Sequence, residues 1–494
     1  MNNPEVVNKL RPYQKTAFDF MTAQKDYIML ANSKGTALQY DDMGLGKTFT
    51  TLCCVEALNA FPCIIVAPKF ALLVWQDEIQ KWLGKYAVIY SGKPKDRMSQ
   101  WKEFITMGDK FLVTNYALLP EIAIRSGIKL DNARTSVCEP GNFKWGAIIW
   151  DEAHMGGLFN HKTASYKVSL KLAREIPTRY VLTGTPFRQG CVDLYGPLSL
   201  LDPVKFNSYW KFVNKYCTII ETAFGKEIER NPSNLEGFRA LLKQYMVRRL
   251  KEDVLLELPG KQRQALFVEM LPQQKKLYAE LTEQLIAEVP DSEELLITPN
   301  QMTLMMRQRQ ILACPQVLGL KVRGAAIDAI MEHSHLSMDN EKPIVIFTPF
   351  RSSIDFVAQA LQEEYPGIEL YVIQGKMSAE EFGASWMGFQ NSKNPKRALL
   401  CVIKSGASFH STAASTAYFL GYEWDFNFNE QCEDRLNRMG QKDFVNIYYV
   451  MTKGTVDENV AAKLNDKKSS SNWVVGTDKQ YMAMLKQLNR PKTR

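Results

Sequence analysis

Short apolar runs that end in glycine, proline or acidic residues alternate with longer amphipathic stretches over about residues 25–200. Such runs are typical of buried strands in a parallel sheet, and the stretches between them are typical of helices. The alternation predicts a doubly wound α/β unit, whose ligands bind beyond the carboxyl ends of the strands. The runs are PCIIVAP (62–68), KFLVTNY (110–116), WGAIIWDEAH (145–154) and TRYVLTGTP (178–186).

The same pattern returns in the last third of the chain, after a region whose apolar residues recur at helical spacing. We therefore expect four parts in the 494 residues: a first α/β lobe (1–200), a largely helical insertion (201–335), a second α/β lobe (336–465), and a linker with a basic tail (466–494). The returning runs are KPIVIFTPF (342–350), IELYVIQG (368–375), RALLCVI (397–403) and NIYYVMTKG (446–454).

Composition excludes several classes of protein. No run of about 18 apolar residues is present, and the N-terminal MNNPEVVNKLRPYQ lacks the apolar centre of a signal peptide. We expect a cytoplasmic protein of a bacterium or of a phage-infected host, or a nuclear one in a eukaryote. The nine cysteines are scattered without a CxxC pair, which favours reduced thiols over disulfides or zinc. The net charge of +8 permits a polyanionic partner but does not require one.

The stretch DDMGLGKTFT (41–50) is the first candidate site. Gly44 and Gly46 would let backbone N–H groups approach phosphate oxygens, Lys47 would neutralise the β- and γ-phosphates, and Thr48 would hold Mg²⁺. The strict phosphate-loop pattern has a further glycine where Asp41 stands. An ordinary turn between a strand and a helix is therefore the alternative interpretation.

A second candidate site is IIWDEAH (148–154), in which an apolar strand ends in two carboxylates. Asp151 is placed to hold Mg²⁺ and Glu152 to polarise the water that attacks a γ-phosphate. Solvated acids that end a strand are the alternative. Together with the lysine-containing loop, this pair predicts hydrolysis of a nucleotide, with Mg²⁺ as a cofactor.

The stretch QCEDRLNRMGQK (431–442) places Arg435 and Arg438 three residues apart, on one face of a helix. Two arginines in this arrangement could reach a bound nucleotide and stabilise charge on its γ-phosphate. Surface arginines that pair with Glu433 and Asp434 are the alternative interpretation.

The ordered set of motifs resembles the superfamily 2 helicase motor, and within it the SNF2-like translocases. The resemblance covers about residues 8–462. Its shared motifs are LRPYQ (10–14), DDMGLGKT, VAPKFALLVWQDEIQKW (66–82), DEAH, LTGTP (182–186) and QCEDRLNRMGQ. Three further stretches resemble SNF2-like proteins in particular: VRRLKEDVLLELPGK (247–261), RQRQILACP (307–315) and MTKGTVDENV (451–460).

The resemblance implies two RecA-like parallel-sheet lobes that bind ATP between them. It implies that Arg11 and Gln14 recognise adenine and that Gln441 also contacts the nucleotide. Coupling between the site and DNA would involve His154, Thr183 and Thr185. The implied DNA-backbone contacts are Lys69, Thr114, Tyr116, Arg351, Lys404, Ser405 and Trp424, with a core aromatic as the alternative for Trp424.

The chain departs from the family pattern in three places. The glycine-rich motif of the second lobe is IKSGASFHSTAAS (403–415), which lacks the second glycine and an asparagine. Gln189 stands where an asparagine is common, and the stretch 374–390 lacks an arginine often found there. These changes make the DNA contacts of the second lobe atypical.

The motifs leave several functions open. The first is a DNA-dependent ATPase that translocates on duplex or branched DNA, remodelling forks or moving junctions in replication, recombination or repair. Strand separation, displacement of DNA-bound proteins and a non-motor scaffold regulated by ATP are the alternatives. The motor motifs fill nearly the whole sequence, which favours fork or branch remodelling over chromatin remodelling. No membrane partner is expected.

Overall fold

The computed structural model describes residues 4–23, 33–107, 110–130, 143–184, 190–222, 225–255, 257–284, 286–288, 295–297, 301–408, 411–423 and 426–457. The chain divides into two compact units, with the division between Leu256 and Glu257. Unit 1 is formed by the described residues before this point and unit 2 by those after it. The division falls within the segment 201–335, and the predicted boundaries of the four segments stay predictions.

Unit 1 is built on a seven-stranded sheet with the order β3-β4-β2-β5-β6-β1-β9. All neighbouring strands of this sheet are parallel. A parallel sheet brings the carboxyl ends of its strands to one edge, where the loops can form a site. Its strands are β1 (Gly35–Gln39), β2 (Cys63–Ala67), β3 (Ala87–Tyr90), β4 (Phe111–Asn115), β5 (Ala147–Trp150), β6 (Thr178–Leu182) and β9 (Met246–Val247).

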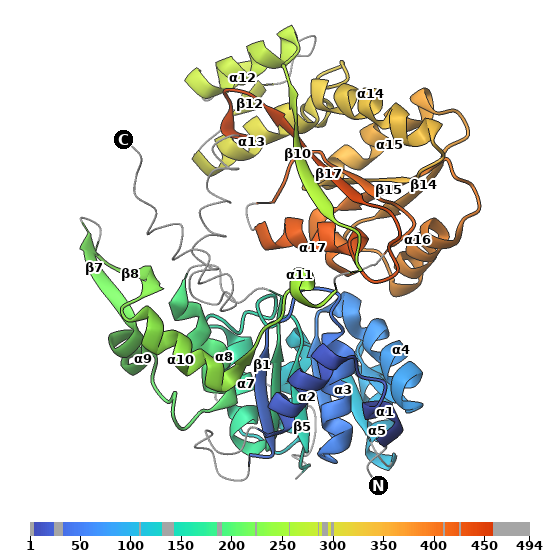
Figure 1. Ribbon diagram of the computed structural model, residues 1–494. Coiled ribbons are helices and arrows are strands. Elements are labelled where there is room, and N and C mark those ends of the chain that lie inside the picture. Colours follow the sequence, from blue (N-terminus) through green and yellow to red (C-terminus); the bar gives the residue numbers. More distant parts are fainter. Residues whose placement is uncertain are drawn as a thin grey trace. The chain divides into compact units, whose positions relative to one another are not determined.

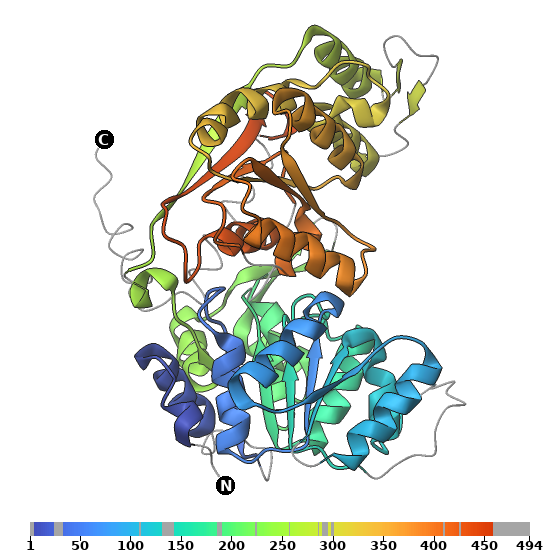
Figure 2. The same ribbon diagram turned by 90° about the vertical axis from the view of Figure 1, so that its right-hand side faces the viewer.

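Helices cover both faces of this sheet (Figures 1 and 2). On β2, Ile65 packs toward α2 (Pro12–Ala23), α3 (Lys47–Ala57) and α4 (Leu72–Leu83), whereas Ile64 packs toward the opposite face. Successive side chains of a strand point to opposite faces, so both must be apolar here. Full burial of one such side chain contributes about 2 kcal/mol. The opposite face is covered by α5 (Pro94–Thr106), α6 (Leu119–Arg125), α7 (Ala164–Glu175), α8 (Tyr195–Leu201), α9 (Tyr209–Tyr216) and α10 (Leu235–Tyr245).

The segment that was expected to be largely helical also contains strands. An antiparallel pair, β7 (Cys217–Thr222) and β8 (Gly225–Pro232), follows α9 in unit 1 (Figure 1). After α10, the short strand β9 returns to the sheet beside β1 and leads into α11 (Lys251–Val254). The later part of the segment belongs to unit 2 and contributes α12 (Pro272–Gln284), the pair β11 (Ile286–Glu288) and β12 (Leu295–Ile297), and α13 (Gln301–Ala313).

Unit 2 is built on a six-stranded parallel sheet with the order β10-β17-β16-β13-β15-β14. Helices α14 (Ala325–Asp339) and α15 (Ile354–Glu364) cover one face, and α16 (Ala379–Asn391) and α17 (Phe426–Leu436) cover the other. Two parallel-sheet lobes were expected, and the fold class is confirmed. The strands are β10 (Lys261–Val268), β13 (Ile344–Thr348), β14 (Glu369–Ile373), β15 (Arg397–Val402), β16 (Thr416–Phe419) and β17 (Val445–Thr452).

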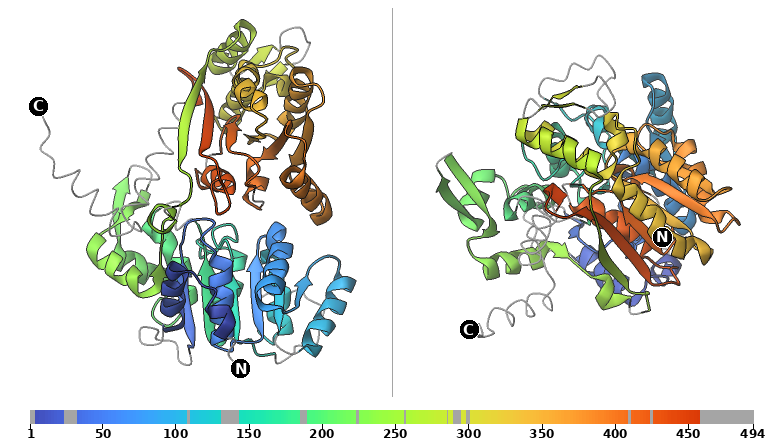
Figure 3. Two further views of the ribbon diagram at one scale, coloured as in Figure 1. Left: turned by 45° about the vertical axis from the view of Figure 1, so that its right-hand side comes forward. Right: turned by 90° about the horizontal axis from the view of Figure 1, so that it is seen from above.

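Strand β10 pairs with β17 over its whole length (Figure 3). Ion pairs also connect β10 to α17. Lys261 Nζ lies 2.9 Å from carboxylate oxygens of both Glu433 and Asp434. Arg263 donates to Glu433 at 2.7 and 2.6 Å, and Glu433 is fully buried. The two acids beside Arg435 in the sequence are thus engaged by basic residues of β10.

The eight described cysteines are buried and free of disulfides, as expected for reduced thiols. Burial raises the pKa of the Cys53 thiol to about 12, which keeps it protonated at neutral pH. Across the described ranges, no helix combines the length and the apolar character that a membrane span requires.

Candidate active site

The loop between β1 and α3 has the backbone of an anion-binding turn. Gly44 and Gly46 adopt left-handed φ angles of 84° and 77°, which glycine reaches without strain. Gly46 is the N-cap of α3, and no side chain caps this helix end. The N–H groups of the first turn of α3 are therefore available for an anion, with Lys47 and Thr48 as its first two residues.

The left-handed backbone and a close contact with the Gln14 side chain explain why position 46 is a glycine. A Cβ atom at Gly46 would lie 2.4 Å from Gln14 Nε2. Gln14 is buried, donates to the Leu45 carbonyl at 3.2 Å, and accepts from the Arg11 N–H at 3.0 Å. The segment 10–14 thus contacts the loop directly through Gln14, whereas the Arg11 side chain is exposed. Recognition of adenine by these two residues stays a prediction.

Lys47 lies over the loop. Its Nζ donates to the carbonyl of Asp41 at 2.7 Å and to that of Asp42 at 3.4 Å. Asp41, which stands in place of a glycine, is fully buried and forms an ion pair with Arg249. Sequence reasoning did not connect these two residues, because 208 positions separate them.

The acidic pair follows β5. Asp151 accepts hydrogen bonds from Trp75 Nε1 at 2.8 Å and from the Glu152 N–H at 3.0 Å, one on each carboxylate oxygen. Its backbone carbonyl accepts from Tyr116 Oη at 2.6 Å. Burial and the charge of Glu152 raise the pKa of Asp151 to about 7, so a cation here would be bound favourably.

Trp75 is a site residue that sequence reasoning missed. It lies on α4, is buried, and holds one carboxylate oxygen of Asp151 in place. Hydrogen bonds of this kind orient metal ligands. Its only signal in the sequence is its position inside the stretch 66–82.

His154 connects the acidic pair to the end of β6. The buried imidazole Nδ1 lies 2.9 Å from Thr183 Oγ1 and 3.3 Å from Glu152 Oε2. Glu152 itself has a left-handed φ of 46°, a conformation that costs energy in a residue other than glycine. The structure brings the predicted coupling residues His154 and Thr183 together, and Thr185 lies outside the described residues.

The site residues fit a nucleotide with Mg²⁺. Thr48 and Asp151 would supply two oxygen ligands, and phosphate oxygens and water would supply the rest, as Mg²⁺ prefers. Within the described residues, no group of three or more His, Cys, Asp or Glu side chains could hold a metal ion. The N-terminus of α3, which no side chain caps, fits the phosphates.

In unit 2, Arg435 lies in the last turn of α17, and Arg438 follows the end of the helix at Leu436. The prediction that the two arginines share one face of a helix is therefore corrected. Both side chains are half-buried. The prediction for Gln441 requires a correction. Its buried side chain donates to the carbonyls of Ala414 and Leu436, and its Oε1 accepts from the N–H groups of the next two residues. This set of bonds gives Gln441 a structural role in unit 2 and leaves little capacity for a nucleotide.

The predicted DNA contacts separate into two groups. Lys69, Arg351 and Lys404 are exposed, and Ser405 is half-buried. Thr114 is a correction, because it is fully buried and its hydroxyl donates to the Tyr90 carbonyl at 3.0 Å. The Tyr116 hydroxyl is bonded at the acidic pair, as described above. Trp424 lies outside the described residues, as does Gln189.

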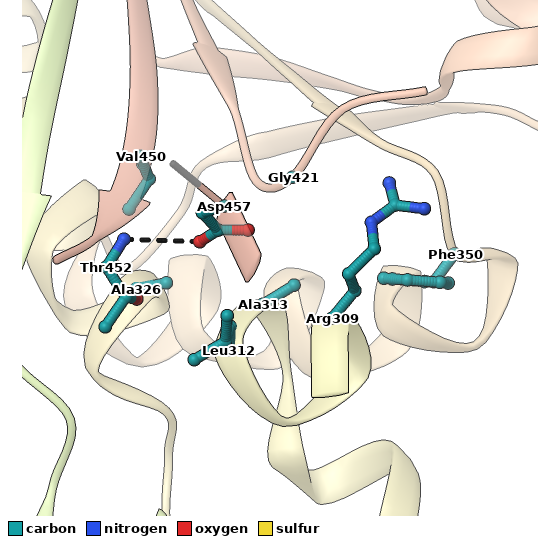
Figure 4. Close-up of a pocket in the computed structure, with 9 residues that line it drawn as sticks. All are labelled: Arg309, Leu312, Ala313, Ala326, Phe350, Gly421, Val450, Thr452 and Asp457. Atoms are coloured by element: carbon teal, nitrogen blue, oxygen red, sulfur yellow. Dashed lines mark hydrogen bonds between the residues drawn. The ribbon is translucent and has the colours of Figure 1, made fainter. Parts of the chain in front are cut away.

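The stretch 307–315 has a structural part in unit 2. Arg309 projects from α13 beside Phe350 (Figure 4). Its guanidinium donates to the carbonyl of Tyr422. Asp457 lines the same small cavity and accepts from the Thr452 N–H at 3.2 Å. The cavity of about 10 Å³ holds one water at most, so it is no ligand site.

Comparison with known proteins decides the family. Residues 13–317 match the family described as the SNF2-related domain, which is more than half of the chain. The chain belongs to the SNF2-related family. The resemblance inferred from the motifs is therefore confirmed, and the SNF2-related domain includes both the phosphate loop and the DEAH stretch.

Several curated proteins resemble this SNF2-related chain. The mouse DNA annealing helicase and endonuclease ZRANB3 is 27% identical over 93% of this chain and 40% of the relative. An uncharacterized ATP-dependent helicase of Mycoplasma pneumoniae is 24% identical over 94% of this chain and 42% of the relative. The chain thus spans about 40% of the length of these relatives.

Solved structures also match this SNF2-related chain. The SWI2/SNF2 ATPase core of Sulfolobus solfataricus in complex with dsDNA aligns over 97% of this chain and 95% of that one, at 23% identity and a TM-score of 0.41. The same core domain in another structure aligns over 97% and 93%, at 22% identity and a TM-score of 0.40.

Proposed function

We propose that this chain is a DNA-dependent ATPase that translocates on duplex or branched DNA and remodels forks or drives branch migration. One observation supports the ATPase most directly. Strand β6 lies between β1 and β5, so the phosphate loop and the acidic pair follow strands of one sheet that are a single strand apart. A phosphate-binding loop with nearby carboxylates is the arrangement that γ-phosphate hydrolysis requires.

The residues of unit 1 would divide the chemistry among them. Lys47 and the N–H groups at the start of α3 would bind the phosphates, and Asp151 with Thr48 would hold Mg²⁺. Bound Mg²⁺ neutralises charge on the phosphate oxygens. Glu152 would orient a water molecule and take its proton. These side chains are half-buried, and partial exclusion of water strengthens each electrostatic contribution.

Arg435 and Arg438 of unit 2 would add positive charge to the γ-phosphate in the transition state. Hydrolysis would then depend on both units, which is the requirement for converting ATP turnover into movement.

DNA would be held by its backbone, because a translocase must tolerate every sequence. Lys69, Arg351 and Lys404 are exposed cations suited to such contacts. One curated relative is named a DNA annealing helicase, which supports DNA as the partner. Phosphate contacts predict that affinity falls steeply as salt concentration rises.

The test is the ATP hydrolysis rate without DNA and with single-stranded, linear duplex, forked duplex and four-way junction DNA. The Glu152→Gln variant serves as the blank. We expect the greatest stimulation on forks or junctions, followed by migration of a labelled junction. Equal stimulation by plain duplex would contradict the branched-DNA preference and keep the translocase. No stimulation by any DNA would overturn the proposed motor.

A further inference from the structure

The carboxylate of Asp41 is held by three hydrogen bonds from side chains. Arg249 donates from Nε to Oδ1 at 2.8 Å and from Nη2 to Oδ2. Gln39 Nε2 donates to Oδ2 at 2.7 Å. Asp41 is fully buried, and a buried carboxylate that loses its cation partner is strongly destabilising. The phosphate loop therefore depends on Arg249 for the charge balance of its first residue.

Arg249 also contacts the segment that precedes Gln14. Its Nη1 donates to the carbonyl of Tyr13, and its guanidinium carbon lies 5.8 Å from the centre of the Tyr13 ring. The neighbouring Gln14 donates to the Leu45 carbonyl inside the loop. One guanidinium thus connects the segment 10–14 to the loop 41–46.

The backbone around Arg249 extends the contact between β9 and β1 into the loop. The N–H of Tyr40 donates to the carbonyl of Val247 at 2.9 Å, and the N–H of Asp42 donates to the carbonyl of Arg249 at 3.0 Å. The N–H of Lys251 donates to Asp42 Oδ2 at 2.9 Å. Residues 247–251 therefore form hydrogen bonds with both the main chain and the side chains at the start of the loop.

Lys47 rests on the part of the loop that Arg249 holds. Its Nζ donates to the carbonyls of Asp41 and Asp42. A shift of these two residues would move the ammonium group away from the position set by the loop. Positioning of charged groups before the ligand arrives accounts for much of their effect in a binding site.

We propose that Arg249 is a positioning residue of the nucleotide site, which fixes the phosphate loop through Asp41 and the segment 10–14 through Tyr13. The inference rests on the proposed function only in its first step, nucleotide binding. Arg249 takes no part in the chemistry, and its effect reaches the nucleotide through the loop and Lys47.

A matched control lies at the other edge of the same sheet. Arg125 is another arginine of unit 1 that forms an ion pair with a carboxylate. It is buried, and it donates to Glu121 at 3.1 Å and to the Tyr90 hydroxyl at 2.8 Å. Tyr90 belongs to β3, whereas Arg249 follows β9, and these strands form opposite edges of the sheet. Loss of either arginine breaks an ion pair that is largely shielded from solvent, but only the Arg249 pair touches the phosphate loop.

The experiment measures the Kd of fluorescently labelled ADP and the urea midpoint of unfolding for the full chain and its variants. We expect Arg249→Gln to weaken ADP binding at least about tenfold, and Arg249→Lys to lie between it and the native chain, because lysine keeps the charge without the bidentate geometry. Arg125→Gln should lower the unfolding midpoint and change the Kd by less than about twofold, since its ion pair is remote from the loop.

A double-variant cycle tests whether the effect passes through Asp41. Adding Asp41→Asn to Arg249→Gln removes the unpaired carboxylate, so the double variant should bind ADP more tightly than Arg249→Gln alone. A folded Arg249→Gln variant with native ADP affinity would overturn the inference, as would an equal loss of affinity in Arg125→Gln. Native binding of ADP without DNA-stimulated hydrolysis would overturn the proposed motor and leave the inference standing. A native chain that binds no nucleotide would overturn both.

Discussion

The indole N–H of Trp75 donates to Asp151 Oδ2 at 2.8 Å, so a residue of α4 fixes one oxygen of the carboxylate that would hold Mg²⁺. Trp75→Phe removes this bond and keeps most of the buried ring. We expect the Mg²⁺ concentration for half-maximal ATPase activity to rise about 10-fold or more, because hydrogen bonds of this type tune metal affinity. A Mg²⁺ titration of the hydrolysis rate measures the change.

Trp82 supplies the control for this variant. It lies on the same helix and donates from Nε1 to Glu78 Oε2 at 2.5 Å, at a distance in sequence of two turns from Trp75. Trp82→Phe should leave the Mg²⁺ dependence unchanged. Equal Mg²⁺ dependence in the Trp75→Phe variant and the native chain would contradict a role of Trp75 in metal binding.

Glu152→Gln should retain nucleotide binding and lose hydrolysis. The amide is close in shape to the carboxylate but cannot accept the proton of the attacking water, and loss of such a base costs about 100-fold or more. Single-turnover hydrolysis of labelled ATP, with ADP binding measured in parallel, checks both halves. Turnover near the native rate would mean that another group activates the water.

Thr183→Val should reduce the stimulation of hydrolysis by DNA more than it reduces the basal rate. The change removes the hydroxyl bonded to His154 and leaves the imidazole buried without this partner. The measured quantity is the ratio of the rates with and without duplex. Ser199→Ala is the control, because it breaks the 2.7 Å hydroxyl pair of Ser199 and Tyr166, both outside the predicted site. Similar ratios in both variants would indicate a general loss of stability.

Arg438→Ala should abolish hydrolysis and weaken duplex binding little, because its proposed role is confined to charge on the γ-phosphate. ATPase rates and the Kd of a labelled duplex, measured on one preparation, separate the two properties. Full ATPase activity in the variant would show that unit 2 contributes no arginine to the reaction.

Acid should destabilise unit 2 through Glu433. Burial raises the pKa of this carboxyl, but Lys261 and Arg263 lower it by more, so the net pKa lies below its ordinary value of 4.5. A carboxyl whose pKa is lower in the folded chain than in the unfolded chain stabilises the fold at pH values above the unfolded pKa. This stabilisation is lost as the pH falls through the folded pKa. Urea unfolding at pH 7 and at pH 4 should show a smaller difference in Glu433→Gln than in the native chain. An equal difference would assign the acid sensitivity to other groups.

The sequence predicted what depends on local pattern. The parallel strands, the glycine loop before Lys47 and the acidic pair after β5 all lie in short stretches whose residues determine the local backbone. Thr114 shows the limit of motif matching. Its role as a DNA contact was predicted from its position in a motif. Because helices cover both faces of the sheet, the residues on both faces of a strand are buried, and Thr114 is among them.

Contacts between distant parts of the chain could not be predicted. The aspartate at position 41 departs from the glycine pattern of the motif, and its ion pair with Arg249 explains this departure. Arg249 follows the two-residue strand β9, which is too short to show a periodic pattern in the sequence. Likewise, β10 lay within a region of helical period. The role of its basic residues, such as Arg263, becomes clear only from the fold, in which α17 places Glu433 beside them.

The edge strand β9 has a consequence for dividing the protein into fragments. The N–H groups of Tyr40 and Asp42 find their acceptors on Val247 and Arg249, so a fragment that ends near residue 200 would leave both donors and the Asp41 carboxylate without these partners. The smallest recombinant piece that retains the native loop must therefore extend through Lys251, well beyond the last strand of the first α/β pattern.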